Sequence, residues 1–239
     1  IGYSLGESAG LFSTRAWTAR DEMYRRMVGG DLFTRQLAGA CESARKTWNL
    51  AAGDVVDWSM GVVDRTADET RAALESRERV YLLIVNTRRE CIVGGQRAAV
   101  ESFVADLDCH YFPIEGVTTV HCEVAKPVAD AYRELHLFET IPPPGVRYYS
   151  GNLGKDYELT RESAADSIVG NAVHGLDYPA TVNSAYANGA RIFVEMGPGA
   201  TCCRMIDQIL GDRPHAAMSV SIPGQDATAV ALRALGRLL

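Results

Sequence analysis

The chain opens with the stretch that decides its fold, Ile1-Gly2-Tyr3-Ser4-Leu5-Gly6-Glu7-Ser8-Ala9-Gly10. This stretch contains two overlapping G-x-S-x-G patterns, one centred on Ser4 and the other on Ser8. The pattern is typical of a nucleophile elbow, a tight turn from a strand into a helix that exposes a serine hydroxyl, although ordinary glycine-rich turns also contain it. The start of the following helix offers free N–H groups and positive potential to an oxyanion. The opening therefore predicts a catalytic serine.

The positions of the glycines favour Ser4 over Ser8. With Ser4 as the nucleophile, Gly2 and Gly6 flank the turn, where side chains are expected to collide. With Ser8 as the nucleophile, Gly10 would fall inside the helix and Gly2 would have no explained role. Because only three residues precede Ser4, we expect the chain to lack the N-terminal part of its large subdomain, including the strand before the elbow.

The composition limits the classes of function. A chain of 239 residues can form one large domain or two smaller lobes. Its apolar content of 47% and charged content of 23% are typical of folded globular domains. The net charge of -6 argues against a nucleic-acid binder, and no apolar run reaches the roughly 18 residues that a membrane span needs. Six cysteines without C-x-x-C spacing predict reduced thiols in the cytoplasm and no metal site.

Alternating hydrophobic patterns predict an α/β fold in two parts. Helices are expected over residues 16–28, 31–49, 66–77, 96–107, 124–138, 160–173, 179–188 and 225–239, and from about residue 201. Strands are expected over residues 80–85, 90–94, 111–114, 146–150, 191–196 and 218–221. The β-β-α-β order in the middle of the chain indicates a small ferredoxin-like lobe. We expect this lobe at residues 79–121, inserted into an α/β-hydrolase-like large subdomain of residues 1–78 and 122–239.

A serine nucleophile needs a general base, for which the chain offers five histidines. His121 stands out because it ends a short β-branched run at the close of the small lobe, just before a new helix. His136 and His215 are expected on a helix surface and in a loop, His110 in a loop before a strand, and His174 near a helix end. Pattern alone does not raise His121 far above the other four.

Several motifs together resemble the acyltransferase domain of polyketide and fatty-acid synthases, the malonyl-transacylase-like fold. The G-H-S-x-G-E motif of that family corresponds to residues 2–7, with Tyr3 in place of the histidine. Its small-lobe asparagine corresponds to Asn86, its A-F-H-S-P segment to residues 119–123, and its F-V-E-x-G-P-G signature stands unbroken at residues 193–199. More narrowly, the chain resembles the acyltransferase of polyunsaturated-fatty-acid synthases, in which a tyrosine precedes the nucleophile.

The resemblance implies ping-pong transfer of an acyl group from acyl-CoA to the phosphopantetheine thiol of an acyl carrier protein. Ser4 would carry the acyl group, His121 would act as the base, and the Leu5 N–H would contribute to the oxyanion hole. Asn171 stands at the position whose carbonyl orients the imidazole, and no cofactor is implied. The family takes a second oxyanion N–H from an upstream Gly-Gln loop, so we expect another synthase domain or a preceding segment as a further partner.

The departures from the family bear on the acyl group. Malonyl-specific members carry an arginine about 25 residues after the serine that pairs with the free carboxylate, and this position is Gly29 here. Tyr3, Gly29 and Asn86 are therefore expected to line a pocket for neutral acyl groups, in which a malonyl carboxylate would be buried unpaired. An arginine at position 29 is expected to raise malonyl transfer. Arg25 and Arg26, one turn earlier, either reach the pocket or form a solvated helix face.

Two functions from other classes stay open. A hydrolase using the same Ser–His pair would pass the acyl group to water, and an idle scaffold domain would not react at all. The arginines at 88 and 89 are candidates for contacting an acidic carrier protein, and a solvated hairpin turn explains them equally well.

Overall fold

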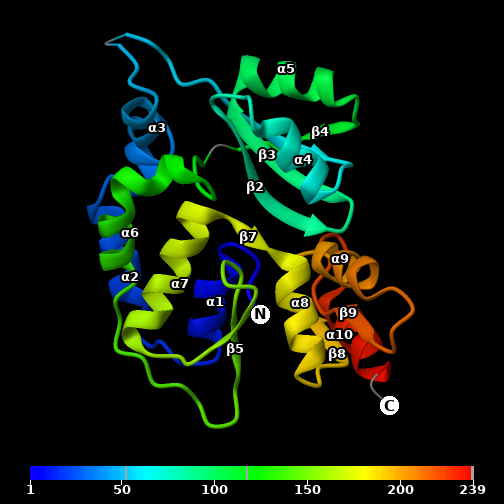
Figure 1. The fold of residues 1–239 in the computed structure, drawn as a ribbon. Helices are drawn as coiled ribbons and strands as arrows, with labels where there is room; N and C mark the ends of the chain where they lie inside the picture. Colours follow the sequence, from blue (N-terminus) through cyan, green and yellow to red (C-terminus); the bar gives the residue numbers. More distant parts are fainter. Residues whose placement is uncertain (52, 117, 238–239) are drawn as a thin grey trace. The chain divides into compact units, whose positions relative to one another are not determined.

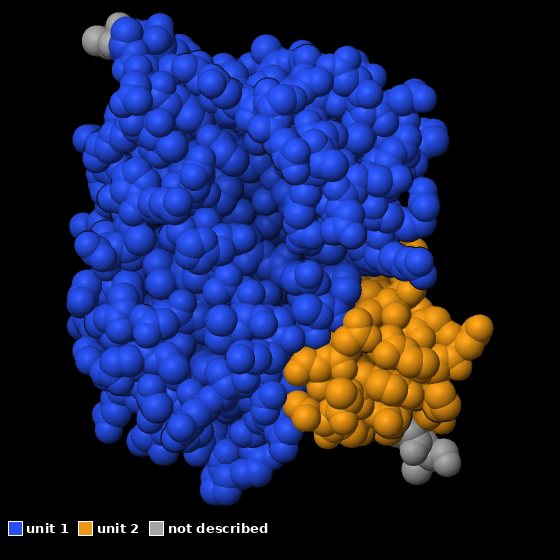
Figure 2. All heavy atoms as spheres, viewed as in Figure 1, with its two compact units in different colours: residues 1–181 blue, residues 182–239 orange. Residues whose placement is uncertain are grey.

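The computed structural model of the chain describes residues 1–51, 53–116 and 118–237. Two units, residues 1–181 and 182–239, can be distinguished within it (Figure 2). Both contain helices and strands, which confirms the mixed α/β class. The division differs from the predicted one, in which residues 79–121 formed the smaller part. The end of the predicted helix 225–239 lies outside the described residues.

A five-stranded sheet in the order β4-β1-β3-β2-β7 forms one part of the first unit (Figure 1). The antiparallel strands are β1 (Trp58–Val63), β2 (Val80–Thr87), β3 (Glu90–Gln96) and β4 (Tyr111–Pro113), and β7 (Leu176–Asp177) is parallel to β2. With the helices α4 (Ala67–Leu74) and α5 (Arg97–Leu107), the first four strands follow a β-α-β-β-α-β order.

The small lobe therefore begins earlier than the predicted boundary at residue 79. Its first strand, β1, lies between β3 and β4 but was not predicted, because its sequence WSMGVV has no continuous β-rich run. Gly61 interrupts the run for a packing reason, since a Cβ atom there would lie 2.4 Å from the Tyr111 ring. The helix α4 was predicted, and its first turn is held by a capping box between Thr66 and Glu69.

The helices α4 and α5 cover one face of this sheet and enclose a separate apolar core. Its buried members are Val63, Val80, Val85, Cys91, Val93, Val100 and Phe103. On the opposite face, the indole of Trp48 stacks on that of Trp58, with ring centroids 5.9 Å apart.

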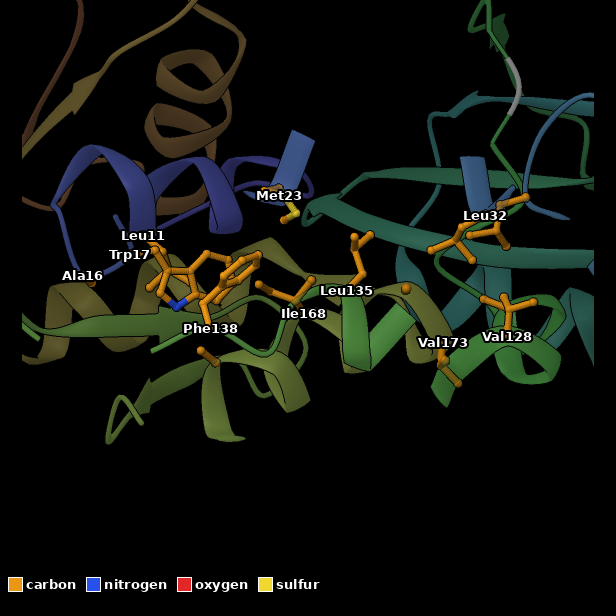
Figure 3. Packing of buried hydrophobic residues seen from close by; sticks show 14 of the residues in the cluster. Leu11, Ala16, Trp17, Met23, Leu32, Val128, Leu135, Phe138, Ile168 and Val173 are labelled. Atoms are coloured by element: carbon orange, nitrogen blue, oxygen red, sulfur yellow. The ribbon is translucent and has the colours of Figure 1, made fainter. Parts of the chain in front are cut away.

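The helical part of the first unit surrounds a larger apolar core (Figure 3). It contains α1 (Gly6–Ser13), α2 (Arg20–Gly29), the short π-helical turn η1 (Leu32–Gln36), α3 (Glu42–Thr47), the 3-10 turn η2 (Glu123–Val128), α6 (Ala129–Leu135) and α7 (Arg161–His174), with a hairpin of β5 (Tyr148–Ser150) and β6 (Lys155–Tyr157). Trp17 is the largest fully buried side chain of this core and packs edge-on against Phe12. The indole N–H of Trp17 donates to the Thr140 hydroxyl at 2.9 Å.

Two of the predicted helices are broken in the structure. The predicted helix 31–49 is interrupted at Gly39 and Cys41, which both have a positive φ. A Cβ atom at Gly39 would lie 2.4 Å from the Thr34 carbonyl oxygen, so the chain turns there instead of continuing as a helix. The predicted helix 124–138 begins as η2, which contains Pro127, and becomes α-helical only from Ala129.

The second unit is built on two parallel strands, β8 (Ile192–Glu195) and β9 (Ala216–Ser219), joined through α9 (Thr201–Leu210). The helix α8 (Tyr178–Ala187) leads into it, and α10 (Ala227–Gly236) follows β9. Among the described residues, this pair is the only parallel pairing outside the five-stranded sheet, so the α/β-hydrolase-like sheet expected for the large subdomain is not found there. The strand predicted over residues 191–196 is present as β8, but Ile192 on it is 55% exposed.

None of the helices in the described ranges is long and apolar enough to cross a membrane.

The core between α5 and the sheet should dominate the stability of the small lobe. Phe103 is 1% exposed, whereas Phe112 on β4 is 61% exposed. We expect Phe103→Ala to lower the free energy of unfolding by about 3–5 kcal/mol, because it leaves a cavity in the core. The matched control Phe112→Ala should cost less than about 1 kcal/mol. Urea denaturation of both variants measures the difference, and equal losses would contradict this assignment of the core.

Candidate active site

Ser4 lies in a tight turn that feeds directly into α1. The Gly6 N–H donates to the Tyr3 carbonyl at 2.9 Å, and the Glu7 N–H donates to the Ser4 carbonyl at 3.1 Å. The φ angle of Ser4 is +51°, in the left-handed region that side chains other than glycine seldom adopt. Such backbone strain is maintained only where surrounding contacts hold it, and it is concentrated at functional sites.

The two glycines of the elbow have different roles. A Cβ atom at Gly2 would lie 2.1 Å from the Glu7 nitrogen and 2.4 Å from the Gly6 carbonyl carbon, so only glycine fits there. A Cβ atom at Gly6 would meet nothing within 4 Å among the described atoms outside its own helix backbone and chain neighbours. The expected collision across the turn is therefore found for Gly2 but not for Gly6.

Ser8, the other candidate nucleophile, lies inside α1. Its side chain is buried, and its hydroxyl donates to the Leu5 carbonyl at 3.0 Å, one turn earlier in the chain. A hydroxyl that back-bonds within its own helix is not presented to a substrate, so the structure favours Ser4.

The structure brings Ser4 and His121 together from distant parts of the sequence. The Ser4 Oγ lies 2.8 Å from the His121 Nε2. His121 has a φ of +68°, so both members of the pair have a left-handed backbone. The His121 N–H donates to the Ala172 carbonyl at 2.7 Å, and two residues earlier the Thr119 N–H donates to the Leu37 carbonyl at 2.8 Å. These backbone contacts hold the segment that carries the imidazole.

The second ring nitrogen of His121 is held by the last turn of α7. Its Nδ1 lies 2.9 Å from the Asn171 carbonyl oxygen, which also accepts the Gly175 N–H at 3.1 Å. A carbonyl can only accept, so the proton of the neutral ring is on Nδ1 and Nε2 presents a lone pair to the Ser4 hydroxyl. The turn depends on Gly175, where a Cβ atom would lie 2.4 Å from the Leu83 carbonyl oxygen.

The surroundings of His121 favour its neutral form. The side chain is buried, and burial lowers the pKa of the imidazole below its usual value of 6.5, while the hydrogen bond to the Asn171 carbonyl acts in the opposite direction. A neutral imidazole whose free nitrogen faces a hydroxyl can accept the proton of that hydroxyl.

Leu5 is the N-cap residue of α1. The first N–H groups of a helix have no acceptor within the helix, and they carry the positive end of its dipole. The Gly6 and Glu7 N–H groups are engaged by the Tyr3 and Ser4 carbonyls, and the Leu5 N–H stays the predicted oxyanion donor.

Two of the expected pocket residues contact each other next to the elbow. The Tyr3 hydroxyl donates to the Asn86 Oδ1 at 2.6 Å, and the Asn86 amide donates in turn to Glu90 at 3.0 Å. The Tyr3 ring packs edge-on against Tyr178, with centroids 5.3 Å apart. Asn86 lies near the end of β2, one residue beyond the pairing of Val85 with β7. These contacts tie the five-stranded sheet to the elbow.

The structure does not bring Gly29 together with this group. Gly29 ends α2 and lines a cavity of about 860 Å³ together with residues of α6, and neither Ser4 nor His121 belongs to the lining.

The guanidinium of Arg26 lies 4.5 Å from the centre of the Phe138 ring and donates to the carbonyls of Glu134 and Leu137. Arg25 is exposed and pairs with Glu22 at 3.0 Å. Neither arginine reaches the serine.

The remaining histidines have other contacts. His136 is buried, contrary to the expected helix surface, and burial lowers the pKa of its ring to about 4. His110 pairs with Asp64 at 2.7 Å and His215 with Asp207 at 3.0 Å. His174 is exposed at the end of α7.

Cys122, which follows His121, is buried, and burial raises the pKa of its thiol to about 12, so the thiol is not a competing nucleophile.

Glu7 has a role that the sequence did not indicate. A carboxylate in the first turn of a helix suits the helix dipole even when it is exposed, yet the Glu7 side chain is only 6% exposed. Its carboxylate accepts hydrogen bonds from the side chains of Ser167 and Asn171. The signal that was available is the spacing of Ser167 and Asn171, which places both side chains on one face of α7.

In the described part of the chain, no group of three acidic, histidine or cysteine side chains is placed to hold a metal ion.

Comparisons with known proteins agree with the resemblance seen in the motifs. No family model matches the chain. The whole chain aligns with a subunit of the polyunsaturated fatty acid synthase of Thraustochytrium sp. at 23% identity over 255 aligned positions. The chain spans 12% of the length of that relative.

The fold matches solved acyltransferase structures over its whole length. The acyl transferase domain of SpnD, solved with a 2-(pent-4-yn-1-yl)malonyl group, has a TM-score of 0.77 at 19% identity, covering 100% of this chain and 54% of that one. The malonyl-CoA:acyl carrier protein transacylase of Helicobacter pylori also has a TM-score of 0.77, at 17% identity, covering 99% of this chain and 70% of that one. These relatives and neighbours confirm the resemblance to acyltransferase domains of polyketide and fatty-acid synthases.

The elbow should not tolerate a side chain at position 2. We expect Gly2→Ala to slow acylation of Ser4 by at least about 100-fold, because its Cβ displaces the backbone that presents the hydroxyl. Gly10→Ala is the matched control, since a Cβ there meets nothing within 4 Å among the described atoms outside the helix backbone. Intact-mass measurement of Ser4 acylation gives both rates, and a Gly2→Ala variant as fast as Gly10→Ala would contradict the elbow geometry.

The lowered pKa of His121 predicts the pH dependence of that acylation. Protonation of Nε2 removes the base, and burial moves this protonation below the ordinary value of 6.5. The acylation rate should therefore still be above half of its plateau at pH 6.5 and fall to half only at lower pH. Rapid-quench acylation rates across pH 4.5 to about 8, with circular dichroism to verify folding, measure this limb. A limb above pH 6.5 would contradict the buried, neutral imidazole.

Proposed function

We propose that this chain is an acyltransferase that moves an acyl group from acyl-CoA to the phosphopantetheine thiol of an acyl carrier protein, through an acyl-Ser4 intermediate. The observation that carries the proposal is the contact of the Ser4 hydroxyl with the His121 Nε2 at 2.8 Å, with the Asn171 carbonyl on the opposite ring nitrogen. The likeness to solved acyltransferases supports the same reaction class.

In the first half-reaction, the Ser4 Oγ attacks the thioester carbonyl carbon while the His121 Nε2 takes the hydroxyl proton. The bond from carbon to Oγ forms, the bond from carbon to sulfur breaks, and the imidazolium returns the proton to the departing CoA sulfur. The negative charge of the tetrahedral intermediate lies beside the Leu5 N–H at the start of α1. No ionised side chain is needed behind the ring, since the Asn171 carbonyl accepts its Nδ1 proton.

In the second half-reaction, the same pair works in reverse. The His121 Nε2 takes the proton of the incoming phosphopantetheine thiol, and the sulfur attacks the acyl-Ser4 carbonyl. The bond from carbon to Oγ breaks, and Ser4 recovers its proton from the imidazolium. We place the carrier protein near the turn between β2 and β3, where the side chains of Arg88 and Arg89 are exposed two and three residues beyond Asn86, which contacts Tyr3.

We propose that neutral acyl groups are preferred over malonyl. The support is that the three arginines of α2 are engaged elsewhere: Arg26 stacks on Phe138, while Arg25 pairs with Glu22 and Arg20 with Asp21 in solvent. In a site that offers no cation, a malonyl carboxylate loses its hydrating water and gains no ion pair to compensate. The preference does not depend on Gly29, because the residues that line its cavity include neither Ser4 nor His121.

The match of the chain to a small fraction of one polypeptide of a polyunsaturated fatty acid synthase supports a place within a larger synthase. We propose that other domains of such a synthase, or a further segment of its polypeptide, act as partners of this chain. A second oxyanion donor would come from that source.

Incubation with acetyl-, longer acyl- and malonyl-CoA, followed by intact-mass spectrometry, tests this function. We expect an acyl adduct that disappears in Ser4→Ala and persists in Ser8→Ala, since the Ser8 hydroxyl is bound within α1. Adducts should form at least about 10-fold faster from neutral acyl-CoA than from malonyl-CoA. Addition of a phosphopantetheinylated carrier protein should then discharge the adduct onto its thiol.

Other outcomes of this experiment would decide against the proposal. Release of free acid at a rate unaffected by the carrier protein would indicate a hydrolase. An adduct that survives in Ser4→Ala would place the nucleophile elsewhere. Faster loading from malonyl-CoA would show that a cation outside α2 binds the carboxylate.

A further inference from the structure

The carboxylate of Glu7 is buried in the first turn of α1 among neutral donors. It accepts hydrogen bonds from the Ser167 hydroxyl and the Asn171 amide, and more weakly from the Gly151 N–H at 3.5 Å and the Tyr157 hydroxyl at 3.4 Å. Burial raises the pKa of this carboxyl, and the hydrogen bonds from Ser167, Asn171 and Gly151 oppose that rise. The charge of the Ile1 ammonium also opposes the rise. Burying a carboxylate whose hydrogen-bond donors are all neutral is still costly, so this site has a cost that simple packing does not explain.

The contacts of Glu7 close a ring around the Ser4–His121 pair. The Glu7 N–H donates to the Ser4 carbonyl at 3.1 Å, so the acid and the nucleophile belong to one turn of backbone. Its carboxylate accepts the side-chain amide of Asn171, whose own carbonyl accepts the His121 Nδ1. The His121 Nε2 returns to the Ser4 hydroxyl. Every link of this ring is a hydrogen bond or a short stretch of chain.

The Asn171 side chain has a single polar contact in this arrangement. Its Nδ2 donates to Glu7, whereas its Oδ1 is buried without a partner among the described residues. The space beside it is tight, since a Cβ atom on Gly151 would lie 3.1 Å from that Oδ1. The amide is therefore oriented by Glu7 alone, and an amide flipped by half a turn would lose its only bond.

We propose that Glu7 is a positioning residue for the nucleophile–base pair: through the Asn171 amide it fixes the α7 carbonyl that holds His121, and so sets the distance from Ser4 to the imidazole. This inference rests on the proposed role of Ser4 and His121 as an acyl-transfer dyad. Glu7 does not touch the reacting atoms. It joins the turn that carries the nucleophile to the turn that orients the base.

A fluorophosphonate probe tests the inference separately from the acyl substrate. Such a probe reacts with any activated serine: the Oγ–P bond forms, fluoride leaves, and the base takes the hydroxyl proton. The maximal rate at saturating probe, expressed per reactive serine, is measured on the full chain by intact mass for the wild type, Glu7→Gln, Asn171→Ala and the double variant. Thermal denaturation of each protein reports stability. Tyr157→Phe is the matched control, because it removes one donor to the same carboxylate and leaves the Asn171 link intact.

We expect Glu7→Gln and Asn171→Ala each to lower the maximal rate by about 10- to 100-fold, with little change in the probe concentration needed for half-saturation. The rate of the double variant should lie within about 3-fold of the rate of the slower single variant, because both changes break the same link. Tyr157→Phe should keep the wild-type rate.

Three results would overturn the inference. The first is a Glu7→Gln variant that melts earlier but reacts at the wild-type rate per reactive serine, which would indicate a purely structural acid. The second is a double variant whose loss is the product of the two single losses. The third is a wild type in which the probe does not select Ser4. A wild type that reacts with the probe at Ser4 but not with any acyl-CoA would instead count against the proposed function alone.

Discussion

The last turn of α7 is the constraint on which the rest of the site depends. Two of its carbonyl groups are used by one residue: the Asn171 carbonyl accepts the ring of His121 in addition to the Gly175 N–H, and the Ala172 carbonyl accepts the backbone N–H of His121. These two contacts fix both the position of the imidazole and its tautomer. Because Gly175 lets the chain turn immediately into β7, the same turn that holds the imidazole also joins the five-stranded sheet.

The site uses strained backbone at both reacting positions. Ser4 and His121 each have a positive φ without being glycine, and neighbouring contacts offset the cost of this conformation. For Ser4 the neighbouring feature is Gly2, whose missing side chain lets the backbone of Gly6 and Glu7 approach. For His121 it is the pair of α7 carbonyls. The nucleophile and its proposed base are therefore held by main-chain geometry, which leaves their side chains with little freedom to move apart.

The sequence predicted the elements whose signals are local, and it failed where the decisive contacts are distant. The run from Val80 and the hairpin after it were predicted because they are strongly apolar and β-rich. The strand β1 was missed because its pairing with β3 and β4, rather than its own composition, makes it a strand. The single helix predicted over residues 31–49 was wrong for a similar reason, since Gly39 and Cys41 adopt left-handed conformations that an apolar periodicity does not reveal.

By itself, the sequence determined which serine could form an elbow, because the G-x-S-x-G spacing and the steric demand at Gly2 are properties of a few adjacent residues. Motif order then selected His121 and Asn171, although pattern alone left five histidines open. Only the tertiary structure decided that the imidazole meets the Ser4 hydroxyl, that Gly29 lines a cavity whose lining includes neither of these residues, and that Glu7 is buried against Asn171. The physical reason is that these contacts join residues more than 100 positions apart in the chain or depend on which side chains α7 buries, and no local spacing encodes either.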